Sequence, residues 1–252
     1  MSDFKVAELS GPITKAMMET GVWKENCPIA LERLREVFVS HCTFDNQVEK
    51  GSLVVLDVVA PYVEKIFQEL FKKRFPIHSI VPIHVWNGDD DTSMDENNTS
   101  AFNFRSIAGM SKLSIHSYGV AIDVNPIQNP FVKSGQKHPD KKCSVVEVWP
   151  TEGWHFMNRL NFKPGMVEPI VNLFHQNGFR NWGGDWDTPI DLHHFEVFRN
   201  ITEFLAVLSY EEGQRFFDQY VTCHENLNTI NFIEEYKKSP SHVWQILAHH
   251  GQ

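Results

Sequence analysis

The spacing of hydrophobic positions divides the first third of the chain into alternating predicted helices and strands. Residues 26–42, NCPIALERLREVFVSHC, carry apolar side chains at helical spacing and predict a helix. Residues 51–59 follow a glycine and are apolar and β-branched, so they predict a strand. Residues 60–76 have an early proline, an apolar stripe and basic residues near the end, which together predict a second helix. Residues 78–86 predict another strand.

The middle of the chain has weaker periodicity. Residues 87–105 are polar and begin at an Asn-Gly pair, so a long loop is expected, of the kind that often carries function. Residues 118–126 predict a third strand that ends at Asn-Pro, and residues 127–150 are predicted to be irregular. Residues 168–179 predict a short helix that closes on Gly178.

From about residue 200 the pattern becomes that of amphipathic helices, over 201–221 and 230–250. Strands interleaved with helices, without regular βαβ spacing, predict an α+β fold with a small, mostly antiparallel sheet and flanking helices. We therefore expect a domain at 1–199 that includes N-terminal helices, and a helical C-terminal extension at 200–252.

Composition and charge narrow the function classes. The formal net charge of −9 argues against nucleic-acid binding and against electrostatic attachment to anionic membranes or wall polymers. No apolar run approaches the roughly 18 residues that a membrane-spanning helix needs. The N-terminus lacks the layout of a secretory signal, so we expect the protein to be cytoplasmic or exported by a signal-independent route.

The cysteines and the acidic loop offer weaker chemistry. The cysteines stand at positions 27, 42, 143 and 223, with no C-x-x-C pair, and free thiols are favoured over disulfides in the absence of a signal. Cys143 lies near lysines, without the histidine partner of a thiol nucleophile. The acidic run within 88–97 lacks the ligand spacing of a calcium loop, so a solvated loop is favoured.

Two segments carry the chemistry, SIHSYGVAIDVNP (114–126) and DWDTPIDLHHFE (185–196). Catalytic zinc uses three protein ligands, usually histidines and a carboxylate. His116 and Asp123 fit two of them if a turn at Gly119 intervenes, because an odd separation on a plain strand would point them to opposite faces.

Either of the adjacent histidines 193 and 194 could be the third zinc ligand. A metallohydrolase also needs a carboxylate that takes a proton from the attacking water. Asp191 lies three positions before His194, whereas Ile190 lies three before His193, so an acid-x-x-His pattern selects His194.

The first segment closely resembles the S-x-H-x-x-G-x-A-x-D signature of zinc peptidases that trim bacterial cell-wall stem peptides. This family groups D-alanyl-D-alanine carboxypeptidases, D,D-dipeptidases and L-alanyl-D-glutamate endopeptidases. Further blocks look similar and occur in family order over roughly residues 40–197: FPIHSIVPI, SMDENNTSAFNFRSIAG, VNPIQNPFV, NRLNFKPGMV and GFRNWGGDWDTPIDLHHFE. The resemblance implies a hedgehog/D,D-peptidase-like fold.

Residue by residue, the resemblance implies one Zn²⁺ bound by His116, Asp123 and His194. It implies Asp191 as the catalytic base, Arg105 facing the scissile carbonyl, and Ser114 lining the substrate site together with Arg105. His193 departs from the family, where many members carry proline or a neutral residue, and its role is open. The stretch at 141–156 is less familiar, and the tail beyond about 200 has no counterpart in the family.

The implied chemistry is consistent with physical expectation. One carboxylate and two neutral imidazoles would leave a zinc site with a net charge of roughly +1, which acidifies a bound water. Asp191 could then carry the proton to the leaving amine, and the Arg105 cation could stabilise the oxyanion. The sequence thus predicts a zinc metallopeptidase acting on peptidoglycan stem peptides or other peptides that contain D-alanine.

Two alternatives stay open at this point. A D,D-dipeptidase working in the cytoplasm would suit the missing signal. A non-catalytic zinc-binding interaction module of the same fold would need neither Asp191 nor Arg105, so their presence argues against it. Which bond is cut, and whether at a chain end or internally, is not readable from the sequence.

Overall fold

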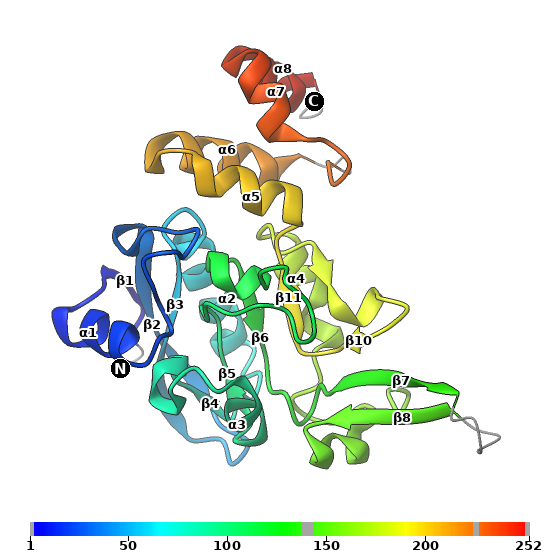
Figure 1. Cartoon of the computed structure of the whole chain (residues 1–252). Helices are drawn as coiled ribbons and strands as arrows, with labels where there is room; N and C mark the ends of the chain where they lie inside the picture. Colours follow the sequence, from blue (N-terminus) through cyan, green and yellow to red (C-terminus); the bar gives the residue numbers. More distant parts are fainter. Residues whose placement is uncertain (1–2, 138–143, 224–226, 250–252) are drawn as a thin grey trace.

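The computed structural model describes residues 3–137, 144–223 and 227–249. Its first elements form an antiparallel sheet of order β1-β2-β3, with the helix α2 packed against it (Figure 1). The elements of this part are β1 (Lys5–Glu8), α1 (Gly11–Glu19), η1 (Leu31–Arg33), β2 (Leu34–Cys42), β3 (Val48–Leu56) and α2 (Ala60–Lys72). The predicted strand at 51–59 and the predicted helix at 60–76 are present.

The helix predicted at 26–42 is wrong, because most of this segment is the central strand β2. β2 pairs with β1 on one side and along its whole length with β3 on the other, from Leu34↔Leu56 to Cys42↔Val48. Two hydrogen-bonded neighbours satisfy its backbone in the sheet, and the apolar spacing within the segment itself carries no record of them.

The segment after α2 also differs from expectation. The predicted strand at 78–86 is only β4 (Ser79–Ile80) followed by the 3₁₀ helix η2 (Ile83–Trp86). Pro82 precedes η2 and lacks the N–H that a continuing strand would use.

The predicted loop at 87–105 contains the helix α3 (Asp90–Asp95) and the strand β5 (Asn98–Thr99). Asp89 caps α3 by accepting a hydrogen bond of 3.1 Å from the Thr92 N–H. This is a start signal of a kind readable in the sequence.

Three further small sheets occur among the described residues: the parallel pair β4-β5, and two antiparallel sheets with orders β6-β11-β9 and β10-β7-β8. The elements here are η3 (Ile115–Tyr118), β6 (Ala121–Asp123), β7 (Phe131–Lys137), β8 (Ser144–Trp149), η4 (Thr151–Phe156), η5 (Glu168–Ile170), α4 (Val171–His175), β9 (Asn181–Trp182), η6 (Gly183–Asp185), β10 (Ile190–Asp191) and β11 (His194–Glu196). The β7–β8 pair extends away from the rest of the molecule (Figure 1) and overturns the expectation of an irregular 127–150. β7 also pairs with β10, which lies much farther along the chain, at Ile190↔Val132.

The C-terminal part is helical, as predicted, but each predicted helix is divided into two. The helices are α5 (Arg199–Val207), α6 (Tyr210–Thr222), α7 (Phe232–Lys238) and α8 (Pro240–His249). Ser209 starts α6 with a capping box that it forms with Glu212. Figure 1 shows these helices stacked at one end of the molecule, with α7 and α8 farthest from the sheets.

The α+β class with small, mostly antiparallel sheets and C-terminal helices is confirmed. One hydrophobic cluster runs through the sheet, α2 and the C-terminal helices. The division at about residue 200 stays a prediction. Among the described residues, every helix is too short or too polar to cross a bilayer.

Candidate metal centre

Three buried side chains from distant parts of the sequence meet at one point, those of His116, Asp123 and His194. His116 Nε2 lies 3.0 Å from Asp123 Oδ2 and 3.2 Å from His194 Nδ1. His194 Nδ1 lies 2.9 Å from Asp123 Oδ1. The two motifs singled out in the sequence therefore meet, and they meet through the residues that the resemblance implied.

A tight turn gives His116 its position. Ser114 precedes η3, and its hydroxyl accepts a hydrogen bond of 3.3 Å from the His116 N–H. Gly119 ends η3 with φ +69°, and a Cβ there would lie 2.6 Å from the Leu56 backbone nitrogen. Only glycine fits both conditions, so the turn expected from the odd separation of His116 and Asp123 is present.

The register of the β6-β11-β9 sheet brings the other two donors together. Asp123 in β6 and His194 in β11 are direct partners in an antiparallel pair, so their side chains leave the same face. Both strands are buried along their length. The donors therefore sit on a rigid part of the fold.

Hydrogen bonds at the outer ring nitrogens orient both imidazoles. His116 Nδ1 lies against the carbonyl oxygen of Ala101, and His194 Nε2 lies 2.9 Å from Glu196 Oε2. Both partners accept, so each outer nitrogen carries the hydrogen and each inner nitrogen presents a lone pair. The sequence analysis did not identify this contact between Glu196 and His194.

These donors suit a divalent cation such as zinc. Two lone pairs and a carboxylate at close range repel one another unless a cation or a proton lies between them. Tetrahedral ligands about 2.1 Å from zinc are roughly 3.4 Å apart, a little more than the separations seen here. Small side-chain movements would therefore accommodate the ion, with His116 Nε2, His194 Nδ1 and Asp123 as ligands.

The charges of the cluster shift the pKa values of its members. Burial raises the pKa of Asp123, but the charges of His116 and His193 and the hydrogen bonds outweigh burial and hold it well below its usual range. Burial lowers the pKa of His194, but its hydrogen bonds to Asp123 and Glu196 outweigh burial and raise it well above the usual range. A metal must displace the proton held here, so binding should weaken in acid.

Asp191 lies next to this cluster in the chain but is not among its donors in the described residues. Its Oδ1 lies 2.9 Å from His193 Nε2, an ion pair without the angle of a regular hydrogen bond. Burial lowers the pKa of His193, but the Asp191 and Asp123 carboxylates outweigh burial and raise it to about 9. Gly183 packs so closely that a Cβ there would lie 2.8 Å from Asp191 Cβ.

Residues 108–197 match the family model of D-alanyl-D-alanine carboxypeptidase. The resemblance stated from the motifs is thereby confirmed over these residues, and it indicates a peptidase. The matched segment contains the three donors and Asp191. No curated protein and no solved structure matches the chain.

Arg105 lies outside the segment that matches the carboxypeptidase family. Its Nη2 forms an ion pair of 2.6 Å with Asp90 Oδ2, at the start of α3. Its backbone is held by Ser117, whose hydroxyl accepts from the Arg105 N–H and donates to the Arg105 carbonyl. The arginine is therefore anchored beside the turn of His116, and its role toward substrate stays a prediction.

Ser114 is predicted to line the substrate site, and this prediction also stays untested. In the structure its side chain is buried, and its hydroxyl caps the turn that presents His116. The Ser114 hydroxyl therefore has a structural role in holding the His116 turn.

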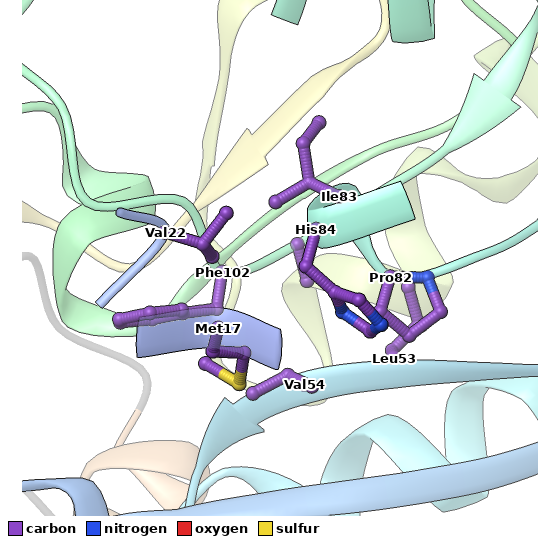
Figure 2. Close-up of a pocket in the computed structure, with 9 residues that line it drawn as sticks. Met17, Val22, Leu53, Val54, Pro82, Ile83, His84 and Phe102 are labelled. Carbon is purple, nitrogen blue, oxygen red and sulfur yellow. The ribbon is translucent and has the colours of Figure 1, made fainter. Parts of the chain in front are cut away.

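A small, mostly apolar hollow is lined in part by Ala101, whose carbonyl oxygen lies against His116 Nδ1. It is also lined by residues including Met17, Val54, His84 and Phe102, as Figure 2 shows, and has room for about one water molecule. This is far below the size of a small-molecule site, which is roughly 300 Å³ or more. None of the three candidate metal donors lines the hollow.

Proposed function

We propose that this protein is a zinc-dependent metallopeptidase that hydrolyses a peptide bond in peptidoglycan-type peptides containing D-amino acids. The observation that carries the proposal is the convergence of two imidazole lone pairs and one carboxylate at a buried point, within a segment that matches the carboxypeptidase family. Zinc bound there would polarise the scissile carbonyl and acidify the attacking water.

The remaining steps fall to the side chains of the chain itself. Asp191 is the general base: its Oδ1 is buried against His193, so Oδ2 is the oxygen that takes the proton from water and passes it to the leaving amine. Arg105 supplies positive charge to the carbonyl oxygen as the tetrahedral intermediate forms. Arg105 would exchange part of its contact with Asp90 for the substrate.

Incubation of the zinc-loaded protein with purified muropeptides and with the free dipeptide D-Ala-D-Ala, followed by mass spectrometry, tests the proposal. Loss of a terminal D-alanine indicates a carboxypeptidase, and cleavage between L-alanine and D-glutamate indicates an endopeptidase. Turnover of D-Ala-D-Ala alone would indicate a D,D-dipeptidase. Full zinc occupancy without cleavage of any of these would favour a non-catalytic zinc-binding module.

A further inference from the structure

His193 is a buried histidine that the three-donor cluster does not use. Its side chain is 3% exposed, and the residues that could hold a metal together include His194 but not His193. Its two ring nitrogens have different partners: Nδ1 lies 2.8 Å from the carbonyl oxygen of Asn129, and Nε2 lies 2.9 Å from Asp191 Oδ1. The imidazole therefore bridges a backbone carbonyl and the proposed base.

The carbonyl of Asn129 is a fixed point because the whole residue is held in place. Its side-chain nitrogen Nδ2 donates to the backbone carbonyls of Val124, Asn125 and Gly165. Its side-chain oxygen accepts from Arg159 at 2.8 Å and from the Val167 N–H at 3.0 Å. Arg159 is itself held by both carboxylate oxygens of Glu168.

The same contacts determine which oxygen of Asp191 is available. The carbonyl of Asn129 and the carboxylate of Asp191 both accept, so His193 faces each of them with a ring nitrogen that carries a hydrogen. Asp191 Oδ1 is fully buried against that nitrogen, while the side chain as a whole keeps 15% of its surface. On the other side, Gly183 of η6 packs closely against Asp191, because a Cβ at this glycine would lie 2.4 Å from the Asp191 carbonyl oxygen.

We propose that His193 is a positioning residue for the hydrolytic reaction, which anchors Asp191 Oδ1 to the Asn129 carbonyl so that Oδ2 faces the reacting water. The inference rests on the proposed role of Asp191 as base. His193 is not one of the three side chains close enough together to hold a metal, and both of its ring nitrogens have partners within the protein.

Substitution of His193 tests the kinetic part of the inference. His193→Phe fills a similar volume without a donor, and it should lower kcat by roughly ten- to a hundredfold, the range for outer-shell partners, with KM and zinc content unchanged. His193→Gln keeps an N–H donor and should recover part of kcat. His41→Phe, at another histidine that is 2% exposed, is the matched control for buried substitution and should leave kcat unchanged.

A spectroscopic measurement tests the contact without activity. In the ¹⁵N-histidine NMR spectrum of the metal-free protein, Asp191→Asn should shift the His193 Nε2 resonance, whereas Asp187→Asn, an exposed acid in the same loop, should not. An unchanged His193 resonance in Asp191→Asn would overturn the inference. If the wild type is active and His193→Phe keeps its full kcat, the inference is also overturned. The proposed function is unaffected by that result. If the wild type cleaves none of the substrates, the proposed function fails and the NMR result alone decides whether His193 anchors Asp191.

Discussion

His116 is the side chain on which the candidate metal centre depends most. Its Nε2 is within 3.2 Å of both other donors, and no other donor among the described residues is placed to replace it. We expect His116→Ala to lose most of about one equivalent of zinc that the wild type binds, as measured by elemental analysis after desalting. His155→Ala, at an exposed histidine, is the control and should keep its zinc. Full occupancy in His116→Ala would refute the assignment.

Asp191 tests the division between ligand and base. Asp191→Asn removes the charge and keeps the shape, so zinc content and folding should stay near those of the wild type. The rate should fall about a hundredfold or more, as for loss of a general base. Loss of zinc together with activity would make Asp191 a ligand. Retained activity would give the base role to Glu196, although the bond of Glu196 to His194 argues for an orienting role.

Arg105 tests the stabilisation of charge in the transition state. Arg105→Ala should leave zinc in place and lower kcat more than it raises KM, because the guanidinium matters most when the carbonyl oxygen becomes negative. Asp90→Asn is the matched comparison, because it removes the anionic partner of Arg105 and keeps the cation. It should lower kcat less than Arg105→Ala does. Steady-state kinetics on one substrate compares the three proteins, and an unchanged kcat in Arg105→Ala removes this residue from the mechanism.

At the scale of elements, the close contact of η6 with β10 positions the proposed base. A Cβ at Gly183 would lie 2.4 Å from the Asp191 carbonyl oxygen, so Gly183→Ala must displace one of the two elements. We expect a lower melting temperature, with a loss of stability of about 1–3 kcal/mol, and a lower kcat at unchanged zinc content. Gly11→Ala, where a Cβ meets nothing within 4 Å, is the control. Equal kcat in the two variants would show that Asp191 does not depend on this contact.

At the scale of the molecule, the C-terminal helices are joined to the rest by specific contacts. Arg33 donates to the Leu208 carbonyl at 2.7 Å and pairs with the buried Asp57. The rings of Phe217 and Tyr62 lie 5.1 Å apart, and Phe217 fills the space beside Gly178. These contacts give the apolar faces of α5 and α6 their partner surface.

Removal of residues 200–252 should therefore lower the melting temperature by several degrees or more and leave zinc binding intact, since all three donors precede residue 200. Phe217→Ala in the full-length chain weakens the same contact without removing the helices. It should lower the free energy of unfolding by about 3–5 kcal/mol. Differential scanning calorimetry and elemental analysis measure both effects. Unchanged melting temperature and kinetics after truncation would mean that these helices serve a partner instead.

The sequence by itself determined the features that depend on neighbouring residues. The apolar stripe of α2 and the β-branched run of β3 are local patterns, and both elements were predicted correctly. The donor residues could be named because they belong to short motifs with chemically specific side chains. The turn at Gly119 could be expected because an odd spacing would otherwise separate His116 from Asp123.

Only the tertiary structure decided what depends on partners outside the segment or motif itself. β2 has a helical spacing of apolar residues but forms a strand, because β1 and β3 satisfy its backbone on both sides. The orientation of His194 depends on Glu196, and the anchoring of His193 depends on the Asn129 carbonyl. Such contacts are made by whichever hydrogen-bonding groups the fold brings within about 3 Å, and a linear pattern carries no record of that distance.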